Sequence, residues 1–108
     1  MITLPVYNIL MLPEVNYYFQ KDYLKKLTQE NLEPNEKVLF LVLREDKSKD
    51  ELTPGDFYPI GVTGTITEAD SDGGISIRAE ERVQIDTLEM ENGKINVAYF
   101  IKADIADM

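Results

Sequence analysis

The fold is decided by residues 60–85, which read IGVTGTITEADSDGGISIRAEERVQI. Ile60, Val62 and Ile66 alternate with threonines, and this period of two indicates a strand with one apolar face. Residues 72–74, Asp-Gly-Gly, have the composition of a hairpin turn. After the turn the same inner face continues at Ile75, Ile77 and Ala79. The stretch therefore predicts two antiparallel strands joined by a tight turn.

The second of these strands contains a break in its pattern. Glu81 falls where an apolar residue is due, and the apolar positions resume at Val83 and Ile85. One extra residue in a strand would produce this shift. We therefore expect a bend or β-bulge near Glu80 and Glu81.

Further strands are indicated on both sides of this hairpin. Downstream, Asn92-Gly93 is a strong hairpin signal, and the apolar residues Ile95, Val97, Tyr99 and Ile101 alternate after it. Upstream, the unbroken apolar run 38–43 predicts a central strand, and residues 44–56, with Pro54-Gly55, a solvated loop. Residues 2–12 are expected to form a strand buried on both sides, with Pro5 at an edge position.

The segment from residue 15 to residue 31 permits two interpretations. In the first, residues 15–20 form a short strand and Asp22 caps a helix that runs to about Asn31, with Tyr23, Leu24 and Leu27 as its apolar stripe. In the second, one longer helix begins near Asn16. The whole chain is expected to be one mainly β domain, residues 1–108, an antiparallel β-barrel of six or seven strands with one α-helix.

Composition limits the possible functions. The 108 residues include no cysteine and no histidine, which removes thiolate chemistry, the commonest general base and the commonest metal ligand. The net charge of −9 disfavours binding to nucleic acid or to anionic lipid. The start lacks a signal-peptide pattern and the apolar runs are too short to span a bilayer, so we expect a cytoplasmic protein.

No motif for catalysis or cofactor binding is found. Gly93-Lys94 lacks the other residues of a phosphate-binding loop. Residues 70–73 are similar to the start of a calcium loop, but Ile75 occupies the position of its required glycine. The sequence thus predicts no catalytic residue, no cofactor and no metal site.

The aromatic cluster Tyr17, Tyr18, Phe19 and Tyr23 has two interpretations. One is packing against the sheet, because aromatic side chains bury well in small cores. The other is an accessible apolar patch that binds other polypeptides, with Met11 as a further member. Side chains of a strand alternate between its faces, so three successive aromatic residues cannot all point inward.

Five segments together resemble a known family. They are residues 4–13 (LPVYNILMLP), 37–43, 54–62 (PGDFYPIGV), 72–77 and 81–85 (ERVQI). In order and spacing they are similar to the N-terminal domain of bacterial Lon, an ATP-dependent protease, over roughly residues 4–101. The chain departs from that pattern at Glu14, where the family often has glycine, in the shorter stretch 13–27, and within 79–81, where a glycine is replaced.

The resemblance implies a PUA-like β-barrel that selects unfolded or damaged polypeptides for a hexameric protease. In the family, ATP hydrolysis and the Ser–Lys dyad belong to later domains, so no catalytic residue carries over and the chain is expected to be one piece of a longer protease. A stand-alone PUA-like domain that binds RNA or a small molecule is the alternative. The net charge of −9 argues against RNA.

Overall fold

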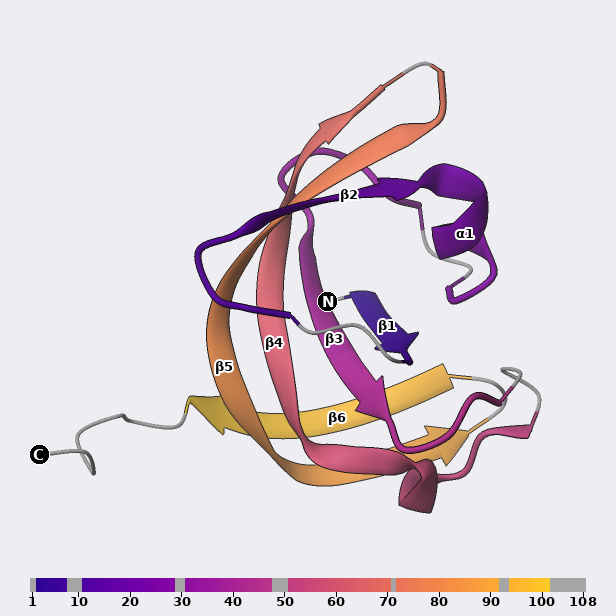
Figure 1. Ribbon diagram of the computed structural model, residues 1–108. Helices are drawn as coiled ribbons and strands as arrows, with labels where there is room; N and C mark the ends of the chain where they lie inside the picture. Colours follow the sequence, from indigo (N-terminus) through magenta and orange to yellow (C-terminus); the bar gives the residue numbers. More distant parts are fainter. Residues whose placement is uncertain are drawn as a thin grey trace, which may run out of the picture.

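The computed structural model describes residues 2–7, 11–28, 31–47, 51–70, 72–91 and 94–101 (Figure 1). These residues form six strands, one α-helix and a short 3-10 helix. The elements are β1 (Ile2–Val6), β2 (Asn16–Gln20), α1 (Lys21–Lys25), β3 (Lys37–Leu43), the 3-10 helix η2 (Pro54–Asp56), β4 (Phe57–Ala69), β5 (Gly74–Glu91) and β6 (Lys94–Ile101). The prediction of a mainly β domain with six or seven strands and one helix is confirmed.

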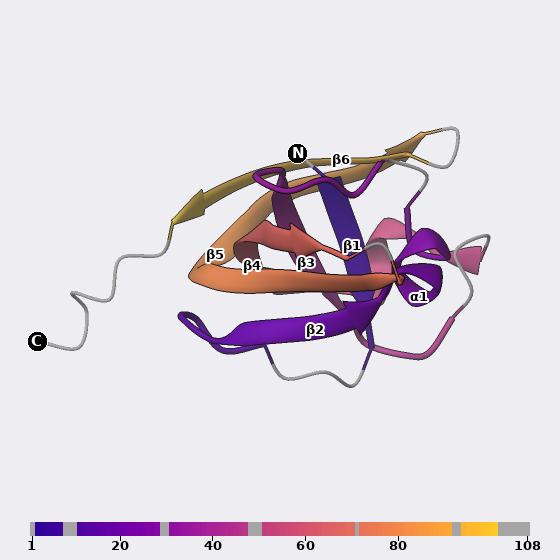
Figure 2. The ribbon, with the colours of Figure 1, turned by 90° about the horizontal axis from the view of Figure 1, so that it is seen from above.

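The strands form one sheet in the order β1-β3-β4-β5-β2, and β6 also pairs with β5. The long strand β5 pairs with β4 along one edge, while its other edge pairs first with β2, through residues 74–78, and then with β6, through residues 83–91. Figure 2 shows the result, with β2 and β6 on opposite sides of the molecule and β5 curving between them.

The sheet differs from the predicted antiparallel barrel in two respects. β1 pairs with β3 in parallel, whereas the other strand pairs are antiparallel. Among the described residues no pairing joins β1 to β2, so the sheet is not closed. Pro5 lies on an edge strand, as predicted, and β3 lies between two neighbours, which confirms it as an interior strand.

The sheet carries a hydrophobic core on each face. Phe40 and Val38 of β3 belong to the first core, together with Leu4, Leu24 and Ile77. Leu39 and Leu41 of β3 point the other way into the second core, which also contains Phe57, Val83 and the half-buried inner residues of β6. The unbroken apolar run of β3 is therefore explained by burial on both faces.

A β-bulge at Glu80 changes the core to which the apolar residues of β5 contribute. Thr63 pairs with Glu81 and the next residue, Gly64, pairs with Ala79, so Glu80 is the extra residue. Ile77 before the bulge lies in the first core, but Val83 after it lies in the second. The predicted bulge is confirmed, although Val83 and Ile85 do not continue the earlier inner face. One extra residue reverses the alternation of all that follow.

The helix is shorter than predicted, and Asp22 does not cap it. α1 follows β2 directly, its N-cap is Gln20 without a side-chain hydrogen bond, and Asp22 lies in the first turn. The strand over residues 16–20 rules out the longer-helix interpretation. Leu24 is buried and Leu27 packs against the first core, which confirms part of the predicted apolar stripe.

One of the predicted loops is partly buried, and the predicted turn at residues 92 and 93 lies outside the described residues. The segment 44–56 is not wholly solvated, because Leu52 is buried in the second core and η2 lies within it. The strands on either side of residues 92 and 93 pair as predicted, with Glu91 opposite Lys94.

Candidate functional site

Three of the predicted aromatic residues form a stacked row, which we call the aromatic ladder. The ring centroids of Tyr17 and Phe19 lie 6.5 Å apart, and those of Phe19 and Tyr23 lie 6.2 Å apart with the rings 10° from parallel. Phe19 also packs on Phe40 in the first core, with 5.8 Å between centroids. Because Tyr17 and Phe19 are alternate residues of β2, both lie on the inner side of that strand.

Tyr18 lies on the opposite side of β2 and is 58% exposed. Its ring lies over Gly74 on the neighbouring strand, where a β-carbon would collide with it. In the sheet register Tyr18 is opposite Ser76, and Ser76 is opposite Glu68 of β4. Tyr18 thus presents one aromatic side chain to solvent, on the face of the sheet that also carries Glu68 two strands away.

Tyr23 stands at the outer end of the ladder and is 38% exposed. It belongs to α1, which the buried Leu24 holds against the sheet. Partial burial raises the pKa of the Tyr23 hydroxyl, and the nearby negative charge of Asp46 raises it further. The ladder therefore ends at an accessible phenol next to the acidic loop that follows β3.

Met11 is only 4% exposed and belongs to the first core. It is part of the core against which Tyr17 and Phe19 pack, and it does not itself present a surface to a ligand. The five predicted binding residues thus divide among three positions: Met11 in the core, Tyr17, Phe19 and Tyr23 in the ladder, and Tyr18 on the outer face.

Two exposed apolar residues beside the ladder were missed from the sequence. Leu12 is 43% exposed, and its backbone N–H donates a hydrogen bond of 2.7 Å to the hydroxyl oxygen of Tyr17. Val15 is 37% exposed and comes just before β2. Between them Glu14 adopts a positive φ of 67°, which turns the chain. The departure from the family pattern at Glu14 was the signal that could have drawn attention to these neighbours.

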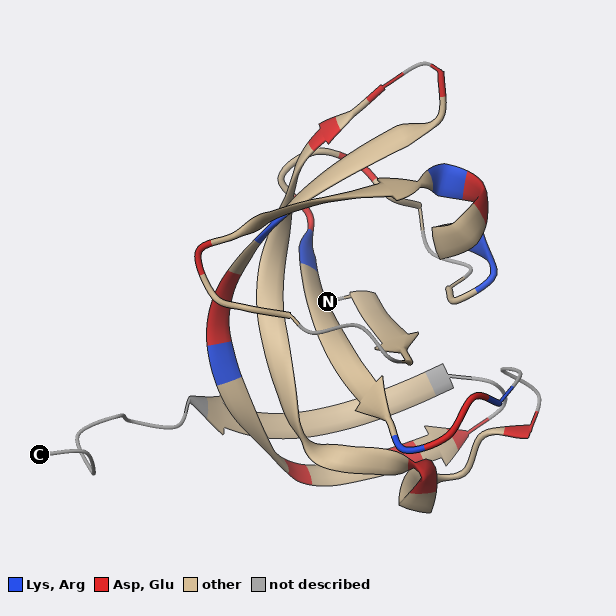
Figure 3. Cartoon of the chain, viewed as in Figure 1, with Lys and Arg blue, Asp and Glu red and all other residues tan. Residues whose placement is uncertain are grey.

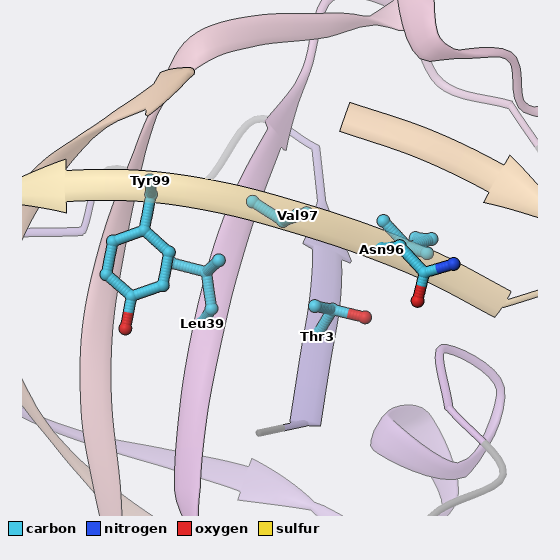
Figure 4. A pocket seen from close by; sticks show the side chains of 6 residues that line it. Thr3, Leu39, Asn96, Val97 and Tyr99 are labelled. Atoms are coloured by element: carbon cyan, nitrogen blue, oxygen red, sulfur yellow. The ribbon is translucent and has the colours of Figure 1, made fainter. Parts of the chain in front are cut away.

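Three further exposed apolar residues, Tyr58, Ile60 and Phe100, lie on β4 and β6. Ile60 was expected on the inner face with Val62. Phe100 had a signal in the sequence: it is an aromatic residue on the side of β6 that the alternation assigns to water. A cavity of about 340 Å³ also opens between β6 and the pair β1–β3 (Figure 4). It is lined by Thr3, Leu39, Ile95, Asn96, Val97 and Tyr99.

Charged residues lie in loops, on α1 and along the middle of β5, and acidic ones predominate (Figure 3). Within the described ranges no three acidic side chains come close enough to hold a metal ion. No helix in the same ranges is long and apolar enough to cross a membrane. The arrangement offers apolar and aromatic contact surface rather than a constellation for acid–base or nucleophilic chemistry.

Comparison with known proteins gives a family and a fold. Residues 1–107 match the family described as the ATP-dependent protease La (LON) substrate-binding domain. Among solved structures, the N-terminal domain of the Mycobacterium avium complex Lon protease is similar, with a TM-score of 0.56 and 19% sequence identity. That match covers 97% of this chain but 56% of the other chain, so this chain spans about half its length. A comparison with curated proteins found no match.

The family match covers nearly the whole chain and includes the five segments on which the sequence resemblance rested. The matched family is a substrate-binding domain and not the catalytic part of the protease, so this chain has a recognition role and is not itself an enzyme. The chain belongs to the family of ATP-dependent protease La (LON) substrate-binding domains.

Proposed function

We propose that this domain binds unfolded or damaged polypeptides through apolar contacts around the aromatic ladder. One observation carries the proposal. Of the eight large apolar residues that are exposed in the described part of the chain, four fall within residues 12–23, namely Leu12, Val15, Tyr18 and Tyr23. A cluster of this kind on a monomeric domain is typical of an interaction surface.

The ladder suits clients that share no fixed sequence. Tyr18 and Tyr23 offer large contact areas and lose little rotamer entropy on binding. Tyr17 and Phe19 keep the surface rigid, because Phe19 stacks on both Tyr23 and Phe40. An unfolded polypeptide exposes the apolar side chains that such a surface binds, so recognition depends on exposure and not on one motif.

Charge adds a preference around the ladder. The carboxylate of Asp46 is close enough to Tyr23 to raise the pKa of its hydroxyl. Glu68 lies on the same face of the sheet as Tyr18, two strands away. Clients with Lys or Arg close to an apolar residue should therefore bind more tightly than acidic ones. This part of the affinity should weaken with added salt, because exposed charges are screened over about 10 Å at 0.1 M ionic strength.

The proposal extends to the protein that contains the domain. It is a cytoplasmic, hexameric ATP-dependent protease of protein quality control, in which ATPase and protease domains follow this PUA-like domain. A single domain binds a client weakly, because a disordered chain loses entropy on binding. Six copies would raise the avidity without any new contact. The acidic charge of −9 supports polypeptide over nucleic acid as the partner.

The experiment separates binding from stability. Tyr18→Ser and Tyr23→Ser are expected to weaken binding of a carboxymethylated, permanently unfolded client, measured by fluorescence anisotropy, while leaving the thermal unfolding midpoint nearly unchanged. Tyr7→Ser is the matched control, since Tyr7 is an equally accessible tyrosine, 43% exposed, that is not part of the ladder. Phe19→Ala is expected to destabilise the fold by about 3–5 kcal/mol, as core aromatic truncations do. Unchanged client binding in both tyrosine variants would refute the proposed surface.

A further inference from the structure

A second apolar surface lies where β4, β5 and β6 run side by side. Ile60 of β4 is directly opposite Gln84 of β5, and Gln84 is directly opposite Phe100 of β6. Directly opposed residues lie on the same face of a sheet, so the three side chains form one row. Ile60 is 44% exposed and Phe100 is 50% exposed, and Tyr58, two residues before Ile60, is 41% exposed.

This row is the uncovered end of the face that carries the first core. Val62 is the next residue on the face of Ile60, and it is 5% exposed within that core. β2 pairs with β5 only through residues 74–78, so it does not reach the part of β5 that holds Gln84. The apolar face therefore continues past the covered region into solvent.

Two of the chain's three arginines flank this surface. Arg82 lies opposite Val62 and two residues before Gln84, so it shares the face of the row and is a diagonal neighbour of Ile60 and Phe100. The guanidinium carbon of Arg44 lies 4.6 Å above the ring centroid of Tyr58. We call Tyr58, Ile60 and Phe100 with these two arginines the arginine-flanked patch.

Among the described residues, neither arginine forms an ion pair with a carboxylate. The ion pairs within these ranges are Lys37–Glu80 and Lys47–Asp56, and neither includes an arginine. The Arg44 Nε donates a hydrogen bond of 3.3 Å to the backbone carbonyl oxygen of Phe57. This is unexpected in a chain with 20 acidic and 11 basic side chains, where a carboxylate is the more abundant neighbour.

We infer that the arginine-flanked patch binds polypeptide segments in which an aromatic or large aliphatic residue stands next to Asp or Glu. Phe100 and Ile60 would contact the apolar side chain, and the Arg82 guanidinium would donate hydrogen bonds to the carboxylate. A planar guanidinium offers paired donors that fit a carboxylate, and such charge-assisted bonds are stronger than neutral ones. Arg44 is already held over Tyr58 and would add positive charge at the other end.

The inference rests on the proposed role in polypeptide binding but assigns a different surface with the opposite charge preference. Tyr23 of the aromatic ladder lies near Asp46, and Tyr18 shares its face of the sheet with Glu68, so this surface favours basic segments. The patch presents two arginines that form no ion pair within the described residues, and it favours acidic segments. Two surfaces of unlike charge on one domain would let it hold apolar segments whatever their flanking residues, which a single acidic surface cannot do.

The test uses the full 108-residue chain and fluorescein-labelled peptides of ten residues, one with Phe between two Asp and one with Phe between two Lys. The acidic peptide is expected to bind wild type, and Arg82→Gln and Phe100→Ser should each weaken it about five- to tenfold, as loss of a charge-assisted or aromatic contact does. Arg82→Glu should reverse the preference in favour of the Lys peptide. Thermal unfolding shows whether each variant is folded.

Arg78→Gln is the matched control, since Arg78 is an exposed arginine of the same strand before the bulge and outside the row. Equal loss of binding in Arg78→Gln, or equal binding of both peptides to wild type, would overturn the inference. The inference would also be overturned if the patch mediated self-association instead of peptide binding. In that case sedimentation would show a dimer that Phe100→Ser abolishes, and neither peptide would bind. Tyr18→Ser should leave acidic-peptide binding unchanged, so failure of the ladder proposal is distinguishable from failure of this one.

Discussion

The ammonium nitrogen of Lys37 lies 3.0 Å from the carboxylate of Glu80, which is the extra residue of the β5 bulge. The same nitrogen donates to the hydroxyl of Thr65 at 2.7 Å, and that hydroxyl donates to Glu80 at 3.0 Å. Side chains from β3 and β4 therefore hold the bulged residue of β5 in place. The hydrogen bond from Lys37 lowers the pKa of Glu80 below its ordinary value.

Replacement of Lys37 by Met should lower the free energy of unfolding by about 0.2–1 kcal/mol at neutral pH, the range for a solvent-exposed ion pair. Because the folded-state pKa of Glu80 is depressed, this stabilisation is present above its unfolded pKa and is lost as the pH falls through the folded one. Urea unfolding of both proteins at several pH values checks this. The difference should shrink in acid, and a difference that grows there would contradict the prediction.

Deletion of Glu80 should be far more damaging than its substitution. Without the extra residue, Val83 and Ile85 would turn away from the second core, because a shift of one residue moves every later side chain to the other face. We expect the deletion variant to lose cooperative thermal unfolding, measured by circular dichroism. Glu80→Ala is the control, since it keeps the bulge and should change the unfolding free energy by less than about 1 kcal/mol.

Gly64 should not tolerate a side chain. A β-carbon there would lie 2.8 Å from the backbone oxygen of Arg78 and 3.2 Å from a methyl group of Ile77. Backbone must move to relieve the first contact, so Gly64→Ala is expected to destabilise the fold by about 1–3 kcal/mol, as overpacking does. Gly55→Ala is the control, because its nearest neighbour would be 4.0 Å away. Equal denaturation midpoints for Gly64→Ala and Gly55→Ala would contradict the prediction, because they would show that β4 and β5 move apart to admit the methyl group at little cost.

Tyr23 should ionise above the ordinary pKa of tyrosine, and Asp46→Asn should lower that pKa while leaving it raised, since burial is the larger cause. Ultraviolet titration of tyrosinate, with Tyr23→Phe to identify the signal, measures both effects. The raised folded-state pKa also means that the contribution of Tyr23 to stability is complete below the unfolded pKa and declines as the pH rises through the folded one. An unchanged pKa in Asp46→Asn would place that carboxylate too far from the ladder to act on it.

Local patterns predicted the parts of the fold that depend on neighbouring residues. Burial on one face of the sheet explains the alternation in β4 and β6, and burial on both faces explains the apolar run of β3. The break in the pattern at Glu80 marks the bulge. The parallel pairing of β1 with β3 did not, because it joins residues 36 positions apart, such as Ile2 and Val38, and no turn fixes it. The helix was predicted too long at its C-terminal end: it ends at Lys25, and Leu27, which suggested that it continues, packs against the first core from beyond that end.

The candidate binding residues could be predicted only as a group. The sequence showed that three successive aromatic residues could not all be buried, but it could not show that Tyr18 would be the exposed one. Met11 has an apolar sequence neighbourhood that fits either a core or a surface position. Ile60 continues a buried face in the sequence pattern. That face is uncovered there because the pairing of β2 with β5 stops at Asn16, opposite Arg78, and does not reach Gln84.

The place of β5 in both cores has a consequence for the order in which the domain folds during synthesis. No core can close before residue 74 leaves the ribosome, because Ile75 and Ile77 form a wall of the first core. The second core must wait longer, for Val83 and then for Tyr99 of β6. The nascent chain should therefore acquire its aromatic ladder while the part that will hold Phe100 is still inside the ribosome.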